Sequence, residues 1–250
     1  MRNWASHRCR GPSRRVLLVA VHMGAVSTCG VAAPERVATS GSHTNTQILR
    51  LPLHDQTAWR LSSYDRIPAH ELEFSAAGLV MSVKRSAMPL IYALPGPLRI
   101  RSVKVRGQLS GQLAIPAGRQ GQKDFDDFGL RIGLVEPGTT RLTSRQRQTA
   151  LPWVRSLFDL APPGRGIAKV HFLNLATEHA QVGQKRRHPR SEHFEEEVLA
   201  APDPEGHFDF GRTYQPPLET CAVWIAVDGD DSSSTFKTTL TQLELEYVSP

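Results

Sequence analysis

The sequence predicts an all-β fold, a jelly-roll-like β-sandwich with one short helix between its strands. Three observations lead to this prediction: many segments in which apolar and polar residues alternate, glycine and proline scattered along the chain, and a single segment with helical spacing. Alternation with a period of two is typical of strands buried on one face, and short strands broken by turns are typical of sandwiches. With 250 residues, 40% of them hydrophobic, the chain is long enough for one sizeable core.

The first 33 residues predict a secretory signal peptide. RGPSRR supplies a cationic start, and VLLVAVHMGAVSTCGVAA follows as an apolar stretch that ends on small residues. A transmembrane anchor is one alternative, which the His, Ser, Thr and two Gly of the stretch weaken. A lipid anchor at Cys29 is another, although Thr28 stands where a lipobox has Gly or Ala. We therefore expect a periplasmic or secreted protein with no membrane span in its mature chain.

The formal net charge of +6 comes mostly from this leader. It holds five of the 30 Lys and Arg and none of the 24 Asp and Glu. The remaining residues carry 25 basic against 24 acidic side chains, a net charge of +1. Such a balance gives no extended basic surface for phosphate backbones, so we expect no nucleic-acid partner. Cys221 is alone after the leader, which excludes a disulfide framework or a cysteine-based metal site.

The expected domain starts after a short linker. Residues 34–47 are small and polar, which predicts a flexible spacer, and residues 48–250 are expected to form a single β-sandwich domain. The clearest strand is VKVRGQLSGQLAI, residues 103–115, which is apolar on one face and rich in Lys, Arg, Gln and Ser on the other. The polar face suits a hydroxylated ligand, but it is equally typical of a solvated strand.

Further strands follow from the same pattern. Alternation predicts them near residues 79–83, 128–134 and 243–247. VWIAV, residues 223–227, is apolar on both faces and predicts a central strand that is covered on each side. KVHFLNLA, residues 169–176, is also strand-like.

Two segments depart from the strand pattern. PWVRSLFDL, residues 152–160, places proline in a first helical turn with apolar residues at helical spacing, and Ser144 is a candidate cap for the helix. HAQVGQKRRHPRSEHFEEEV, residues 179–198, has a basic run followed by an acidic run and little apolar content. For this second segment we expect a long exposed loop whose charges compensate one another.

The stretch DGDD, residues 228–231, allows two interpretations. Asp and Gly are the residues expected in a hairpin turn, which is the interpretation we favour. A Ca²⁺ site is the alternative, in which Asp228 and Asp230 meet Asp127 of the second acidic cluster, KDFDDFG. The EF-hand pattern fails, because Ser233 and Thr239 occupy its glycine and glutamate positions. We expect no other cofactor.

Candidate ligand-binding residues come from these loops and from polar positions in apolar strands. They are Asp126, Asp127, Arg131, His171, Asn174, Trp224, Asp228 and Asp230. Trp224 suits stacking on a sugar ring, but tryptophan is more often a core residue in a sandwich. His171 and Asn174 are also explained by buried or sheet-edge positions with satisfied hydrogen bonds. The carboxylates allow a glycosidase pair, but neither acidic cluster has a spacing that requires catalysis.

Several stretches together resemble a known family. FDDFGLRIGLVE, the strand VHFLNL, and WIAVDGDDSSSTF with its closing strand QLELEY resemble an uncharacterised bacterial family of exported proteins of unknown function. Its members look like carbohydrate-binding-type jelly rolls, and the resemblance covers residues 48–248. It implies a periplasmic β-sandwich with acidic loops, and it implies no catalytic residue.

The sequence thus favours an exported β-sandwich that binds a glycan or another polar envelope ligand without turning it over. The first alternative is a carbohydrate-active hydrolase or lyase that uses the acidic loops. The second is a structural or assembly protein of the cell envelope.

Overall fold

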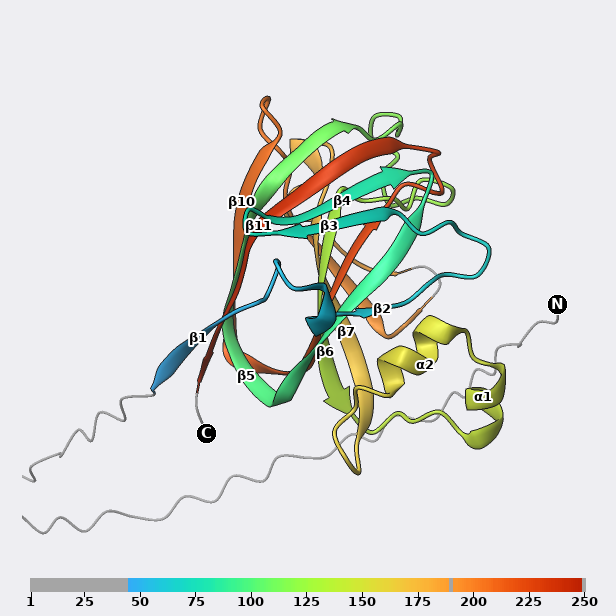
Figure 1. Cartoon of the computed structure of the whole chain (residues 1–250), viewed down its shortest axis with the longest axis vertical. Coiled ribbons are helices and arrows are strands. Elements are labelled where there is room, and N and C mark those ends of the chain that lie inside the picture. The colour runs from blue at the N-terminus through green and yellow to red at the C-terminus, as the bar shows by residue number, and fades with distance from the viewer. Residues whose placement is uncertain (1–44, 189–190, 249–250) are drawn as a thin grey trace, which may run out of the picture. The chain divides into compact units, whose positions relative to one another are not determined.

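The computed structural model describes residues 45–188 and 191–248, which form a mostly β structure with two short α-helices (Figure 1). The strands are β1 (Thr46–Arg50), β2 (Arg60–Leu61), β3 (Glu71–Ser75), β4 (Gly78–Lys84), β5 (Ala87–Gln112), β6 (Leu130–Gly138), β7 (Gly166–Leu175), β8 (Lys185–Arg187), β9 (Phe194–Ala200), β10 (His207–Asp228) and β11 (Thr235–Val248). The helices are α1 (Ser144–Thr149) and α2 (Pro152–Phe158), with 3₁₀ turns η1 (Gln56–Ala58) and η2 (His179–Gln181). The expected signal peptide, Cys29 and most of the spacer lie outside the described residues.

All the strands belong to one mixed sheet with the order β3-β4-β11-β5-β10-β6-β7-β9-β8, in which β1 also pairs with β11 and β2 with β5. The pairs are antiparallel except β7 with β9. The long strands β5 and β10 run side by side for most of their length, with register shifts near residues 213–222. Figure 1 shows β5 curving through a bend, which folds the sheet back on itself into two layers. The expected all-β sandwich is confirmed.

The main core lies between the two layers. Residues on one face of β5, such as Val103 and Val105, share it with Ile132 of β6 and Ile225 of β10. Apolar residues of the strands expected over residues 103–115, 128–134, 223–227 and 243–247 are buried: Val105, Leu109, Leu113, Leu130, Ile132, Ile225, Leu243 and Leu245. On the opposite face of β5, Lys104 and Arg106 are exposed and Gln108 is half-buried. The polar and apolar faces predicted for residues 103–115 are therefore assigned correctly.

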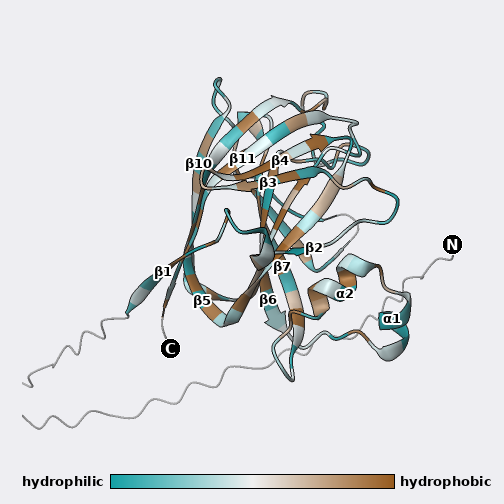
Figure 2. Cartoon of the chain, viewed as in Figure 1, coloured by the Kyte–Doolittle hydropathy of each residue, from teal (hydrophilic) through white to brown (hydrophobic). Residues whose placement is uncertain are grey.

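A second cluster covers the outer face of the layer that contains β6, β7 and β10. Val135, Val170 and Trp224 from these strands pack with Leu157 of α2. The apolar residues on both faces of VWIAV are explained by this arrangement, because one face meets the main core and the other meets α2. Figure 2 shows that α1 is hydrophilic whereas α2 carries hydrophobic residues.

The expected single helix is two helices, and the reason is local. Thr143, rather than Ser144, caps α1 through a reciprocal capping box with Gln146. Pro152 is the first residue of α2 and disfavours helical backbone at Leu151, which is extended. The proline that begins one helix therefore separates it from the other.

The expectation of a long exposed loop over residues 179–198 is wrong. This segment contains η2, β8 and most of β9. The basic and acidic runs face each other across the β8–β9 pair, with Arg186 opposite Glu196. Opposite charges on neighbouring strands attract, so the charge pattern that suggested a solvated loop is the complementarity of a strand pair. Glu196 is buried there, in contact with two arginines.

The start of the first strand and the lengths of the helices are the last points on the fold. β1 begins at Thr46, two residues before the expected start of the domain. Within residues 45–188 and 191–248, no helix has the length and apolar character needed to cross a membrane.

Candidate functional site

A pocket of about 500 Å³ opens on the outer face of the layer that contains β6, β7 and β10. Its aromatic lining residues are Tyr64, Trp153, Phe172, Phe194 and Trp224. Its acidic lining residues are Asp65, Asp126, Asp127, Asp228, Asp230 and Asp231. Arg131 and His188 also line it. We call the aromatic lining residues the aromatic wall and the acidic lining residues the acidic wall. The pocket therefore combines two walls of different chemistry.

The aromatic wall is built around Trp153 and Trp224. Pro152 starts α2 and so places Trp153 in its first turn, where the indole meets that of Trp224 edge-on with ring centroids 5.8 Å apart. Tyr64 also meets Trp153 edge-on, with ring centroids 5.9 Å apart. Gly133 of β6 lies opposite Trp224, and a side chain there would collide with Phe172, since an added Cβ would be 2.8 Å from that ring.

Trp224 itself is nearly covered, with 1% of its surface exposed, so the core position is confirmed for it. Its indole nitrogen is buried and has no hydrogen-bond partner among the described residues. An unpartnered buried donor is unfavourable by roughly 1–3 kcal/mol. Trp224 is thus both a core residue and part of the pocket lining.

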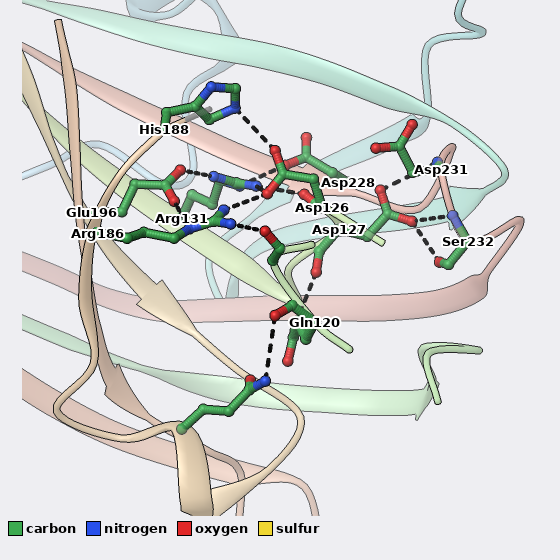
Figure 3. Close-up of polar contacts among 12 residues, drawn as sticks. Gln120, Asp126, Asp127, Arg131, Arg186, His188, Glu196, Asp228, Asp231 and Ser232 are labelled. Carbon is green, nitrogen blue, oxygen red and sulfur yellow. Dashed lines mark hydrogen bonds and ion pairs between the residues drawn. The ribbon is translucent and has the colours of Figure 1, made fainter. Parts of the chain in front are cut away.

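Arg131 is the centre of the acidic wall (Figure 3). Its neighbours Leu130 and Ile132 point into the main core, so strand alternation directs Arg131 to the outer face. The guanidinium lies 2.5 Å from Glu196, 2.8 Å from Asp228 and 3.3 Å from Asp126, measured between the charged atoms.

Two further basic side chains complete this network. Arg186 of β8 forms ion pairs with Asp126 and Glu196, and His188 Nε2 lies 2.9 Å from Asp126. Arg131 also stacks over the ring of Phe128, with its guanidinium carbon 4.4 Å from the centroid. The buried charges are thereby paired, as a low-dielectric position requires.

The network separates the pKa values of the carboxyls. Burial alone would raise the pKa of Asp126, but His188, Arg131 and Arg186 together hold it well below its usual range. Burial raises the pKa of Asp228 to about 7, opposed by Arg131 and reinforced by the neighbouring carboxylates. Burial and the charges of Asp127 and Asp231 raise the pKa of Asp230 to about 6. The pocket thus contains both ionised and partly protonated acids near neutral pH.

The DGDD stretch is a connection between β10 and β11, but it is not the turn of a hairpin. β5 lies between the two strands in the sheet, so residues 229–234 pass from one layer to the other. Asp127 shapes this connection by accepting hydrogen bonds from Ser232 N at 2.6 Å and from Asp231 N at 3.3 Å. Asp228, which a plain turn would leave solvated, is buried against Arg131.

The three carboxylates considered for Ca²⁺, Asp127, Asp228 and Asp230, are not among the described side chains whose ligand atoms lie close enough together to hold an ion. In the part of the chain that the structure describes, the group of three side chains with suitably close ligand atoms is Asp126, His188 and Glu196. Arg131 and Arg186 already contact the two carboxylates of that group. Asp127 already accepts a hydrogen bond from Ser232 in the connection after β10, and Asp228 forms an ion pair with Arg131.

The structure brings together six of the eight candidate ligand-binding residues: Asp126, Asp127, Arg131, Trp224, Asp228 and Asp230. The other two lie elsewhere. His171 faces away from the pocket and contacts Glu136 at 2.7 Å and Glu195 at 3.4 Å. Asn174 is fully buried beside a separate cavity of about 50 Å³, and its amide has no hydrogen-bond partner among the described residues.

Sequence reasoning missed Tyr64, Trp153, Arg186 and Glu196. For Arg186 and Glu196 a signal was present, because KRR and EEE are complementary when read as paired strands. Trp153 was visible as the residue after the proline of a short helix, but nothing local indicates what that helix covers. Tyr64 lies in a segment between β2 and β3 with no pattern of its own.

Comparisons with known proteins find only a distant structural similarity. No protein-family model matches the chain, and no curated protein matches its sequence. The structure is similar to a xylan-binding module, CBM15, with a TM-score of 0.34 and 6% sequence identity, over 81% of this chain and 97% of that one. It is also similar to a xylanase from Cellvibrio japonicus in complex with xylopentaose, with a TM-score of 0.33 and 5% identity, over 81% of this chain and 29% of that one. Similarity this distant does not indicate a ligand or an activity for this chain.

Proposed function

We propose that this protein is an exported β-sandwich that binds a glycan, without turning it over, in the pocket beneath α2. The observation that carries the proposal is the meeting of an aromatic wall and an acidic wall in one pocket of about 500 Å³. Specific small-molecule pockets are of about this size, roughly 300–1,000 Å³, and combine apolar walls with a few placed polar groups.

The two walls match the two kinds of surface on a sugar. A pyranose ring presents a face of C–H groups, which packs on aromatic rings such as those of Trp153 and Tyr64. Its hydroxyl groups are donors around the rim, and carboxylates accept from them in strong, charge-assisted hydrogen bonds. Asp230 and Asp231 line the pocket and form no ion pair within the described residues, so both are free to accept.

Export is the second part of the proposal and rests on the leader. Its cationic start, apolar stretch and small-residue end favour cleavage near residue 33 or 34. N-terminal sequencing of the protein purified from its native host is expected to find the chain starting there. An intact Met1 on protein from the cytoplasm would contradict export.

A glycan-array screen of the mature chain tests the binding function. We expect the wild type to bind a defined set of glycans and Trp153→Ala to lose that binding. Phe158→Ala is the matched control, because Phe158 belongs to the same helix and packs on the same cluster but does not line the pocket. If no glycan binds, or if both variants lose binding equally, the proposal is wrong.

Hydrolysis of the bound glycan is a second candidate, favoured by the separated pKa values in the acidic wall. Asp228, with its pKa raised to about 7, suits a general acid, and Asp126, with its pKa lowered, suits the ionised partner. However, both carboxylates form ion pairs with Arg131, as is typical of a network that stabilises the fold. Release of reducing ends from an array-positive glycan, abolished by Asp228→Asn, would identify the protein as a hydrolase.

A further inference from the structure

The charges that line the pocket are unbalanced. Six carboxylates line it, whereas Arg131 and His188 are its basic lining residues. Arg131, His188 and, from outside the lining, Arg186 pair with Asp126, Asp228 and Glu196. These contacts leave Asp230 and Asp231 without a cationic partner within the described residues.

Asp230 and Asp231 are placed where a ligand reaches them. Asp230 is half-buried and Asp231 is exposed, and both line the pocket together with the aromatic wall. The backbone NH of Asp231 donates to Asp127 at 3.3 Å, so the connection holds this part of the acidic wall in place. Figure 3 shows Asp231 beside Asp127, to which its backbone NH is joined by a dashed line.

One observation independent of the carboxylates points to the chemistry of the ligand. The pocket that Asp230 and Asp231 line is also lined by the aromatic side chains of Tyr64 and Trp153. Aromatic rings attract a cation as well as C–H groups. The pocket thus offers two kinds of group for a ligand cation, carboxylates and aromatic rings.

We propose that the pocket prefers glycans that carry a free amino group over their N-acetylated, neutral or acidic counterparts. This inference rests on the proposed glycan binding and names its ligand class. A protonated amine placed against Asp230 and Asp231 gains Coulomb energy that a hydroxyl or an acetamide does not. A uronic acid in the same place is repelled by the same carboxylates.

Isothermal titration of the mature protein tests the preference with three probes: a glucosamine oligosaccharide, the N-acetylglucosamine oligosaccharide of equal length, and an oligogalacturonate. At a pH where the amine is protonated, we expect the first to bind at least tenfold more tightly than the second, and the third not to bind. Raising the salt from about 0.01 M to 1 M shortens the Debye length from about 30 to 3 Å, so the preference is expected to shrink.

The matched variants separate the local charges from the net charge. Asp230→Asn with Asp231→Asn is expected to reduce the preference for the amine roughly tenfold and to leave binding of the N-acetylated probe unchanged. Glu71→Gln with Glu73→Gln changes the net charge equally on the distant strand β3, where both residues are exposed, and is expected to change neither. Thermal melts verify that the variants fold. The salt titration uses the wild-type protein, so it tests the preference even if a variant fails to fold.

The outcomes distinguish this inference from the proposed function. Equal binding of the amino and N-acetylated probes, or a preference that survives high salt, would overturn the inference and leave glycan binding intact. Failure of every probe, together with a negative array, would overturn both.

Discussion

At the scale of single residues, Arg131 determines whether the acidic wall is stable. Its side chain is 7% exposed and faces buried Glu196, buried Asp228 and half-buried Asp126, so it is the one basic group that contacts all three carboxylates among the described residues. A buried ion pair adds little net stability by itself, but removing one partner leaves an uncompensated charge. Arg131 was among the candidate residues from the sequence, but its structural importance depends on Glu196, which lies 65 positions later.

The first prediction follows from this arrangement. Arg131→Met is expected to lower the free energy of unfolding by about 3–5 kcal/mol, because buried Asp228 loses its counter-ion and buried Glu196 keeps only Arg186. Urea denaturation at pH 7 measures the change. Arg106→Met is the control: it breaks an exposed ion pair with Asp209 and is expected to cost less than about 1 kcal/mol. Equal effects of the two variants would contradict the account.

The second prediction concerns the pH dependence of Asp230. The folded protein raises its pKa from 3.8 to about 6, so the folded state binds this proton more tightly than the unfolded state. The resulting stabilisation is present below about pH 4 and is lost as the pH rises to about 6. Asp230→Asn does not titrate, so its stability relative to wild type is expected to increase from pH 4 to pH 6 and then level off.

Buried His70 makes this comparison with the wild type necessary. Its pKa is lowered to about 4 by burial, so it favours the folded state more as the pH rises, in the opposite direction to Asp230. Because both proteins contain His70, its contribution cancels in the difference between their unfolding curves, which reports Asp230 together with its effect on the pKa of Asp228. A difference that stays constant with pH would show that the pKa of Asp230 is not raised.

At the scale of elements, the sequence predicts those whose pattern is self-contained. Residues 103–115 alternate over their whole length, and their buried and exposed faces are as expected. Residues 223–227 are apolar throughout because both faces of β10 are covered there. β8 and β9 were missed because their strongest signal, opposite charges, appears only when two short segments are read as a pair. The composition of DGDD predicts a hairpin because it does not reveal that β5 lies between β10 and β11 in the sheet.

The third prediction concerns this connection. Added Ca²⁺ and added chelator are both expected to leave the melting temperature unchanged, because the connection is held by Asp127 and its hydrogen bonds to Ser232 and Asp231. If Ca²⁺ bound the folded state, a hundredfold excess over Kd would add about 2.7 kcal/mol. A rise of several degrees with Ca²⁺, lost in Asp228→Asn with Asp230→Asn, would establish the cation site instead.

At the scale of the whole molecule, the fold class follows from the sequence whereas the assembly of the pocket does not. Six candidate residues lie together because the start of β6 lies beside the end of antiparallel β10, where the loop before β6 and the connection after β10 meet. The acidic character of these two loops was visible in the sequence. The aromatic wall was not predicted, since Tyr64, Trp153 and Phe194 come from three segments far apart in the chain. Their meeting depends on how α2 covers the sheet, which local patterns do not encode.

The central claim, that a glycan occupies the pocket beneath α2, is tested most directly by the indole NH signals of tryptophan in an NMR titration. The chain after the leader contains Trp59, Trp153 and Trp224. Trp153 and Trp224 line the pocket, whereas Trp59 is buried in the main core and donates its indole NH to the carbonyl of Pro52 at 3.0 Å. Titrating the mature protein with an array-positive glycan is expected to shift the signals of Trp153 and Trp224 and to leave that of Trp59 unmoved. Saturation with the glycan while both pocket signals stay fixed would contradict the account.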